Sequence, residues 1–181
     1  IFDIKDFYPS ISKDLLNNAI DFAKQHTIIN KDDLDIIYHA RKSLLYLNET
    51  PWQKKSTNLF DVTMGAYDGA EVCELVGLFL LNILCQTFYT KYNIGLYRDD
   101  GLSFLKNING HQADKIRKEF QKLFEEYGLS LEIECNLKKV NYLDVSFDLN
   151  TGTYKPYHKP NDEILYINNK SNHPPNVIKQ L

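Results

Sequence analysis

Three aspartates in two separate segments could together hold divalent cations. Asp99 and Asp100 are adjacent in GLYRDDGLSF, residues 95–104, and Asp3 lies in FDIKDFYPSI, residues 2–11. Each pair of carboxylate oxygens is a ligand of the type that Mg²⁺ prefers in proteins. Two such ions about 3.5–4 Å apart can activate an attacking hydroxyl and stabilise a leaving oxygen at phosphorus. The three aspartates therefore suggest phosphoryl-transfer chemistry, with Mn²⁺ as an alternative metal.

The position of Asp3 within a short strand supports this grouping. In an extended FDI segment, Phe2 and Ile4 face one side of the sheet and Asp3 faces the other. If this strand lies beside residues 95–104, the three carboxylates converge. Like charges at one site raise the pKa of each other's carboxyl groups, and divalent cations relieve that repulsion. We therefore expect a two-metal site.

A simpler interpretation of Asp99 and Asp100 is a hairpin turn. An Asp-Gly pair between apolar runs is a strong hairpin signal, because Gly101 can adopt positive φ and Asp tolerates a turn. On this interpretation the two acids are solvated turn residues. The third carboxylate, Asp3, is what favours the metal site.

Length and composition are those of one globular domain. The chain has 181 residues, of which 43% are hydrophobic and 25% charged. Cys73, Cys85 and Cys135 are too scattered for a disulfide framework or a zinc site, which suits an intracellular protein, nuclear or cytoplasmic. The apolar run 72–84 is too short for a membrane span, and no membrane partner is expected. The net charge of −3 gives no basic surface for nucleic acid.

The elements that must position the aspartates follow from hydrophobic periodicity and helix-start signals. Pro9 is expected to prevent a helix before Ser12, which is a good N-cap. A second helix begins after Asn30. The order predicts an α+β fold with an antiparallel sheet and helices on one face. The remaining predictions are a strand at 58–64, a helix at 70–89, the hairpin at 95–104, a helix at 110–127, strands at 129–135 and 140–149, and a turn at 151–152.

The two acidic segments resemble the catalytic motifs of reverse transcriptases. FDIKDFYPSI resembles their first palm motif, GLYRDDGLSF resembles their Tyr-x-Asp-Asp motif, and MGAYDGAEVCELVGLFL looks like the glycine turn and helix between them. NYLDVSFDL, YKPYHKPND and SNHPP resemble the region after the palm in Penelope-like retroelements. Together, in this order, the motifs are specific. The resemblance implies a polymerase palm, with most of the fingers and the thumb outside this segment.

The resemblance also implies metal-binding roles for four residues. Asp3 and Asp99 would bind both ions, Asp100 would assist, and the backbone carbonyl of Ile4 would supply a further oxygen.

Three further positions match residues that contact the substrates in that family. Tyr8 matches the aromatic residue that excludes a ribose 2′-hydroxyl, so it would favour deoxynucleotides. Tyr97 would pack beneath the hairpin near the primer end. Lys138, or its neighbour Lys139, lies where these enzymes keep a lysine that protonates the leaving pyrophosphate.

The glycine turn both matches and departs from the family pattern. Gly65 and Gly69 match the glycines that let the backbone approach the nucleotide. Asp68, Glu71 and Glu74 stand where the family usually has Pro-Gln or small polar residues. Acids facing a template would repel it, so either they point inward or this surface holds no nucleic acid.

These expectations lead to one main hypothesis and three alternatives. The main hypothesis is a retroelement RNA-directed DNA polymerase palm, residues 1–150, followed by a connection, 151–181, toward a thumb. Its partners would be an RNA or DNA template with primer, dNTPs, and the fingers and thumb of its own polypeptide, without which we expect little or no polymerisation. The alternatives are an RNA-dependent RNA polymerase palm, a degenerate palm that acts as a binding or scaffold module, and a metal-dependent nuclease.

Overall fold

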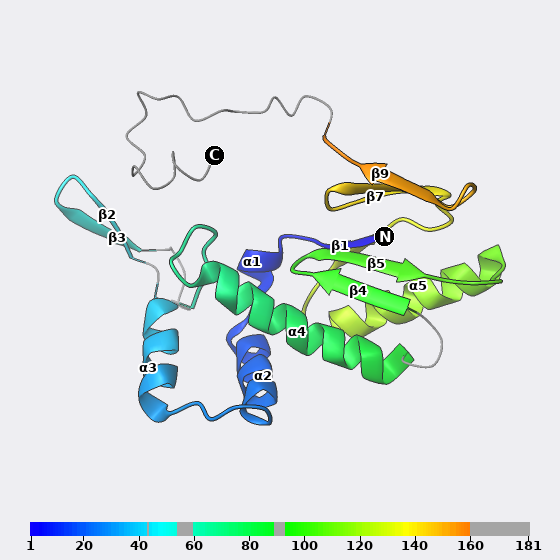
Figure 1. Ribbon diagram of the computed structural model, residues 1–181. Helices are drawn as coiled ribbons and strands as arrows, with labels where there is room; N and C mark the ends of the chain where they lie inside the picture. The colour runs from blue at the N-terminus through cyan, green and yellow to red at the C-terminus, as the bar shows by residue number, and fades with distance from the viewer. Residues whose placement is uncertain (43, 54–59, 89–92, 160–181) are drawn as a thin grey trace.

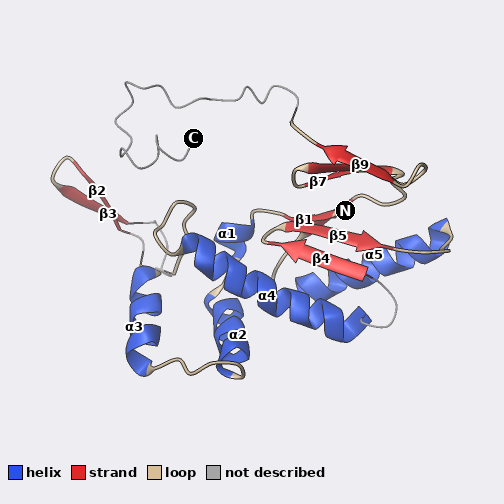
Figure 2. Ribbon diagram, in the orientation of Figure 1, coloured by secondary structure: helices blue, strands red, loops and turns tan. Residues whose placement is uncertain are grey.

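The computed structural model describes residues 1–42, 44–53, 60–88 and 93–159, and within them lie five helices and nine strands. Figures 1 and 2 show their arrangement. The helices are α1 (Phe7–Ser10), α2 (Lys13–Lys24), α3 (Lys31–Ala40), α4 (Gly69–Phe88) and α5 (Gly110–Glu125). The strands are β1 (Phe2–Ile4), β2 (Leu44–Leu47), β3 (Thr50–Gln53), β4 (Asn93–Tyr97), β5 (Asp100–Phe104), β6 (Leu131–Ile133), β7 (Lys139–Tyr142), β8 (Val145–Asp148) and β9 (Thr153–Pro156).

The central sheet has four antiparallel strands in the order β4-β5-β1-β6. Helices α4 and α5 lie on one side of it, and the small sheet β7-β8-β9 lies on the other side of β1 and β5 (Figure 1). Helix α4 contacts β4, and α5 contacts β6. The predicted α+β class with an antiparallel sheet is confirmed, whereas the palm assignment stays a prediction.

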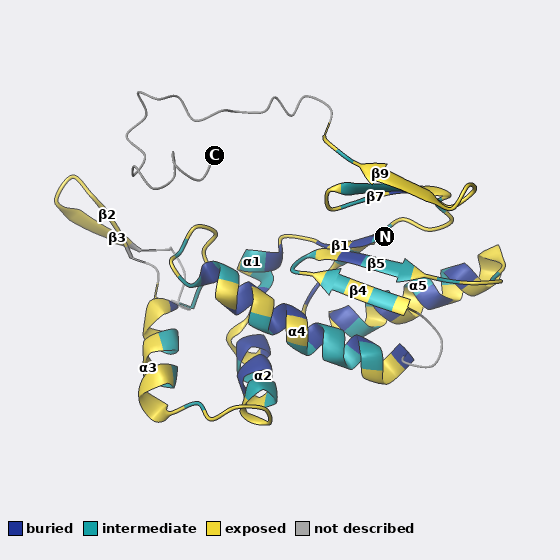
Figure 3. Ribbon diagram, viewed as in Figure 1, coloured by how far each residue is buried: buried dark blue, intermediate teal, exposed yellow. Residues whose placement is uncertain are grey.

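The core forms between the sheet and the helices. Phe2 and Ile4 are 5% and 1% exposed, and the Phe2 ring meets the rings of Phe120 and Phe124 edge-on at 5.6 and 6.0 Å. Figure 3 shows the buried sides of α2 and α4 facing the interior. Burying a large apolar side chain contributes about 1.5–3 kcal/mol, so the apolar residues of β1 anchor this strand firmly.

Helix-cap residues and hydrophobic periodicity in the sequence predicted several elements correctly. Ser12 caps α2 by accepting a hydrogen bond from Leu15 N at 3.1 Å. Asn30 and Asp33 form a capping box at the start of α3, as the predicted helix start requires. The predicted helices at 70–89 and 110–127 are confirmed as α4 and α5 within the described residues.

Other local predictions were wrong. Pro9 does not prevent a helix: it lies in the first turn of α1, where its missing N–H is not needed. The predicted strand at 58–64 is reduced, within the described residues, to an isolated bridge between Phe60 and Lys42; residues 58 and 59 lie outside them. The hairpin β2–β3 had no counterpart in the sequence prediction.

The predicted single strand at 140–149 is two strands. Leu143, with φ of 51°, and Asp144 turn the chain, so that Tyr142 pairs with Val145. Strand β9 then pairs with β8, so this sheet spans the expected boundary at residue 150. Residues 160–181 of the expected connection lie outside the described residues.

Helix α4 is long and apolar enough to cross a membrane by length and composition alone. Eight of its residues are buried in the protein interior. We therefore interpret α4 as the central helix of the core.

Candidate active site

The pairing of β1 with β5 brings two of the three aspartates together. Asp3 is the antiparallel partner of Asp100, and Phe2 is the partner of Gly101. Ile4 N donates a hydrogen bond of 3.0 Å to Asp99 O, which fixes the turn that carries the third aspartate. Asp3 is exposed on the face opposite the buried side chains of Phe2 and Ile4, as strand periodicity predicts.

The turn itself differs from the Asp-Gly turn that the sequence suggested. The two turn residues between β4 and β5 are Arg98 and Asp99, and Arg98 adopts the left-handed conformation with φ of 54°. Gly101 lies inside β5, where a Cβ would be 2.0 Å from Cζ of Phe2. The glycine therefore admits an aromatic ring into the core and is not the turn residue.

Burial and neighbouring negative charges raise the pKa values of Asp3 and Asp100. Burial raises the pKa of Asp3 above its ordinary value, and the charges of Asp99, Asp100 and Glu132 raise it further. Burial and Asp99 also raise the pKa of Asp100, against a smaller opposing effect of Lys159. No ion pair to a lysine or arginine neutralises Asp3, Asp99 or Asp100 in the described part of the chain. Such a group of carboxylates attracts cations.

The donor set fits Mg²⁺ in its chemistry. Within the described ranges, however, no three His, Cys, Asp or Glu side chains are already gathered closely enough to ligate an ion. Binding would therefore draw the carboxylates of Asp3, Asp99 and Asp100 inward by rotation of their side chains. The Ile4 side chain is a buried hydrocarbon with no ligand atom, so only its backbone carbonyl could contribute.

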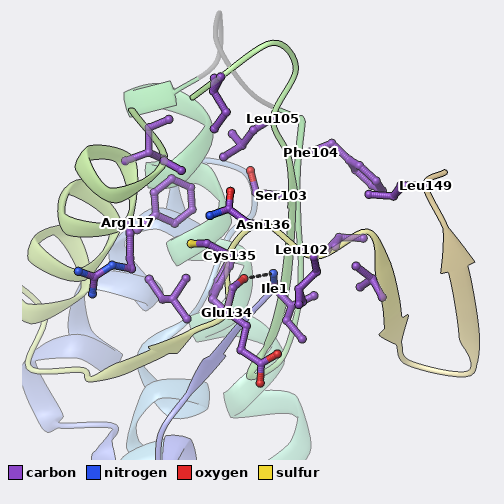
Figure 4. Close-up of a pocket in the computed structure, with 18 of the residues that line it drawn as sticks. Ile1, Leu102, Ser103, Phe104, Leu105, Arg117, Glu134, Cys135, Asn136 and Leu149 are labelled. Atoms are coloured by element: carbon purple, nitrogen blue, oxygen red, sulfur yellow. Dashed lines mark hydrogen bonds between the residues drawn. The ribbon is translucent and has the colours of Figure 1, made fainter. Parts of the chain in front are cut away.

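A small cavity of about 140 Å³ opens beside the aspartates. Its walls include Asp3 and Asp100 from the central sheet, Glu132 from β6 and Tyr142 from β7. A second cavity, of about 260 Å³, lies further along β5, between that strand and α5 (Figure 4). This second cavity is mainly apolar and none of the three aspartates lines it, so it is separate from the candidate active site.

The hairpin that carries Asp99 is tied to α4 by an arginine that the sequence analysis overlooked. Arg98 donates from Nη2 to Glu74 Oε1 at 3.0 Å, and its guanidinium lies 5.4 Å from the centre of the Tyr97 ring. Gly77 of α4 faces the same turn, and a Cβ there would make an ordinary van der Waals contact with Arg98 O at 3.7 Å. Glu74 is thus bound by the protein itself, and local sequence signals did not indicate this pair because the two residues lie 24 positions apart.

The glycine turn before α4 is held in a similar way. Arg41, 1% exposed, donates from Nη2 to Asp68 Oδ1, and Arg41 O accepts from Asp61 N at 2.9 Å. Gly65 has φ of 87°, and a Cβ on Gly69 would lie 2.7 Å from Thr63 O, so both glycines are required by the turn. Asp68 therefore points inward.

Of the three acids near the glycine turn, only Asp68 points inward. Asp68 and Glu74 are each bound by an arginine, but Glu74 stays exposed at the surface, as does Glu71, which has no such partner among the described residues. Because Arg41 and Arg98 each neutralise one of these acids, we expect this surface to repel a template less than the sequence suggested.

Tyr8 and Tyr97 flank the turn. Tyr8, on α1, lies beside the buried Cys73 thiol of α4, and burial raises the pKa of the Tyr8 hydroxyl. Burial also raises the pKa of the Cys73 thiol, to about 11, so it stays protonated. Tyr97 pairs with Asp100 across the hairpin and is half exposed.

The two lysines considered for proton transfer differ in their contacts. Lys139 Nζ lies 3.1 Å from Asp148 Oδ2. Lys138 is exposed, and its carbonyl accepts a hydrogen bond from Leu149 N at 2.7 Å. Within the described ranges the Lys138 ammonium forms no ion pair, and its role stays a prediction.

Comparison with solved structures gives one fold relationship. The chain is similar to the apo telomerase of Candida tropicalis, truncated from its C-terminal domain, with a TM-score of 0.59 at 12% sequence identity. The match covers 86% of this chain and 34% of that chain, so the protein spans about a third of the telomerase. No protein-family model and no curated protein matches the sequence. At this identity the comparison shows a shared, polymerase-like fold.

Proposed function

We propose that this chain is the catalytic palm of an RNA-directed DNA polymerase encoded by a retroelement. The observation that carries the proposal is the register of β1 and β5, which sets Asp3 beside Asp100 with Asp99 in the adjoining turn. The fold shared with telomerase, a reverse-transcriptase-related enzyme, supports it at a coarse level. Assignment to a Penelope-like element is the finer part of the proposal and rests on the sequence motifs alone.

In the proposed reaction a primer 3′-hydroxyl attacks the α-phosphorus of a dNTP, and pyrophosphate leaves. Asp3, Asp99 and Asp100, with the Ile4 carbonyl, would hold two Mg²⁺ ions. Bound there, the ions would lower the pKa of the attacking hydroxyl and neutralise charge on the leaving group. The strand pairing fixes the backbone that carries these aspartates and would thereby supply positioning, which is most of phosphoryl-transfer catalysis.

The other residues would act on the substrates. The Tyr8 ring would exclude a ribose 2′-hydroxyl by steric contact. The turn at Gly65 and Gly69 would bring the backbone close to the nucleotide. Lys138 would donate a proton to the departing pyrophosphate.

A non-catalytic palm is the second candidate. The exposed Glu71, the acidic net charge and the lack of a preassembled ligand set within the described residues favour it. An RNA-dependent RNA polymerase would need to admit the 2′-hydroxyl past Tyr8.

The test is primer extension by the complete open reading frame that contains this chain, on an RNA template with Mg²⁺. Asp99→Asn should abolish dNTP incorporation. Asp6→Asn is the matched control, because Asp6 is exposed and its side chain caps no helix, so activity should remain. If wild type and Asp99→Asn are equally inert on RNA and DNA templates, the non-catalytic candidate replaces the polymerase.

A further inference from the structure

The hairpin β7–β8 rests on the strand that carries Asp100. Val140 and Tyr142 lie on the same face of β7, and Val140 is 7% exposed while Tyr142 is half-buried. The Tyr142 hydroxyl donates a hydrogen bond of 3.2 Å to the backbone oxygen of Asp100, 42 residues away in the chain. This bond joins the small sheet to the central sheet beside an aspartate of the candidate active site.

Tyr142 also forms part of the wall of the small cavity that Asp3 and Asp100 line. The cavity of about 140 Å³ is lined by Asp3 and Asp100 on one side and by Asn141, Tyr142 and Leu143 on the other. A displacement of the β7–β8 hairpin would therefore change both the width of this cavity and the position of the Asp100 peptide.

The hairpin is itself held in place. Asp144 O, at its tip, accepts a hydrogen bond of 2.8 Å from Tyr157 N, and Lys138 O accepts one of 2.7 Å from Leu149 N. Strand β9 pairs with β8 along its length. A side chain supported in this way can hold another group within the tolerance that catalysis needs.

We propose that Tyr142 is a positioning residue for the carboxylate site. Its hydroxyl holds the Asp100 peptide against the β7–β8 hairpin. This contact fixes where the Asp100 carboxylate lies relative to Asp3. The catalytic part of this inference rests on the proposed polymerase function. The contact itself is independent of that function and is tested separately.

The contact can be observed in metal-free protein by labelling with ¹³C-carbonyl aspartate and ¹⁵N-glycine. The sequence has two Asp-Gly peptides, Asp68–Gly69 and Asp100–Gly101, so a carbonyl-amide correlation spectrum contains two signals. Tyr142→Phe removes the hydroxyl and keeps the ring. It should move the Asp100 carbonyl signal upfield, because the carbonyl loses a hydrogen bond, and leave the Asp68 signal in place.

Tyr154→Phe is the matched control, since Tyr154 is an exposed tyrosine on β9 of the same sheet. Both signals should stay in place in this variant. An Asp100 signal that is equal in wild type and Tyr142→Phe would overturn the proposal, as would an equal displacement of both signals, which would indicate a general change of fold.

The positioning role is tested in the complete open reading frame by single-turnover primer extension. Tyr142→Phe should lower the rate constant of incorporation about 10- to 100-fold, since a misplacement of about 1 Å has effects of this size. The Kd for primer–template and the melting temperature should stay unchanged. An unchanged rate constant would overturn the positioning role even if the carbonyl signal moves. If wild type is inert, the polymerase proposal and the catalytic role of Tyr142 both fall, while the carbonyl signal still decides the contact.

Discussion

The Phe2 ring occupies the space where a side chain at Gly101 would begin. The two residues are partners across β1 and β5, and an added Cβ would lie 2.0–2.4 Å from three ring carbons of Phe2. The Phe2 ring is held in turn between Phe120 and Phe124. The glycine after the two aspartates thus leaves room for the Phe2 ring within the strand pair that carries Asp3 and Asp100.

Gly101→Ala should destabilise the protein by about 1–3 kcal/mol, the usual cost of overpacking a core. Urea denaturation would measure the change in free energy of unfolding. Gly95→Ala in β4 is the control, because a Cβ there meets nothing within 4 Å, and it should be neutral or slightly stabilising. Equal effects of the two changes would show that the Phe2 ring moves away freely.

Neutralising any of the three aspartates should raise the melting temperature of metal-free protein at pH 7. The folded protein raises the pKa values of Asp3 and Asp100, so their contribution to stability is greatest below about pH 3.8 and is lost as the pH rises through the raised values. The melting temperature of Asp3→Asn should therefore be higher than that of wild type at pH 7, and this difference in melting temperature should shrink as the pH falls toward 4. Equal or lower melting temperatures for Asp3→Asn, Asp99→Asn and Asp100→Asn would contradict this account.

Mg²⁺ should raise the melting temperature of wild type, because a ligand that binds only the folded state stabilises it. The increase should be lost in Asp99→Asn, whereas Asp6→Asn should keep it. Differential scanning fluorimetry across a Mg²⁺ titration would measure both, without need of polymerase activity. No increase in wild type would argue against the metal site.

Removing one partner of the Arg41–Asp68 ion pair should destabilise the protein by about 3–5 kcal/mol, because a buried charge is left unpaired. The Arg41 side chain is 1% exposed, whereas that of Asp68 is 31% exposed. Asp68→Asn, which leaves the buried guanidinium without its partner charge, should therefore destabilise the protein more than Arg41→Met, which leaves a partly solvated carboxylate. Chemical denaturation of both variants and of the double variant would measure the coupling. Additive effects would show that the pair does not act as a unit.

Breaking the bond between Arg98 and Glu74 should lower activity more than stability. The pair is partly exposed, so its effect on the free energy of unfolding should be at most about 1 kcal/mol. It holds the turn that carries Asp99, so Glu74→Gln should lower the rate of primer extension about tenfold or more. Glu71→Gln, one turn earlier on α4 and exposed, is the control and should leave the rate unchanged.

Tyr8→Ala should admit ribonucleotides, because the ring that would meet the 2′-hydroxyl is gone. Tyr8→Phe keeps the ring and should retain selection for deoxynucleotides. The ratio of kcat/KM for dNTP and rNTP measures this. Unchanged selectivity in Tyr8→Ala would exclude Tyr8 from sugar discrimination.

Local sequence signals were sufficient for much of the fold. The helix starts at Ser12 and Asn30 and the long apolar run of α4 depend on residues within one or two turns of each other. The alternation of Phe2, Asp3 and Ile4 was enough to place the aspartate on the face opposite the core. These features could be predicted because their causes lie next to each other in the chain.

The hairpins were harder to predict. Leu143 turns the chain between β7 and β8 with positive φ, a conformation that leucine rarely adopts, so the apolar alternation of 140–149 indicated one strand. Arg98 also turns the chain with positive φ, which is uncommon for a residue other than glycine, so the sequence prediction placed this turn at Gly101. In both cases the pairing of the flanking strands outweighed the preference of the turn residue.

The sequence by itself identified the candidate residues for chemistry and determined which face Asp3 takes; the tertiary structure alone decided what each acid meets. Asp68 and Glu74 were ambiguous in the sequence because their arginine partners lie 27 and 24 residues away. The contact of Tyr142 with Asp100 spans 42 residues. Hydrophobic periodicity depends only on the spacing of residues along the chain, whereas strand register and helix packing decide which distant side chains become neighbours.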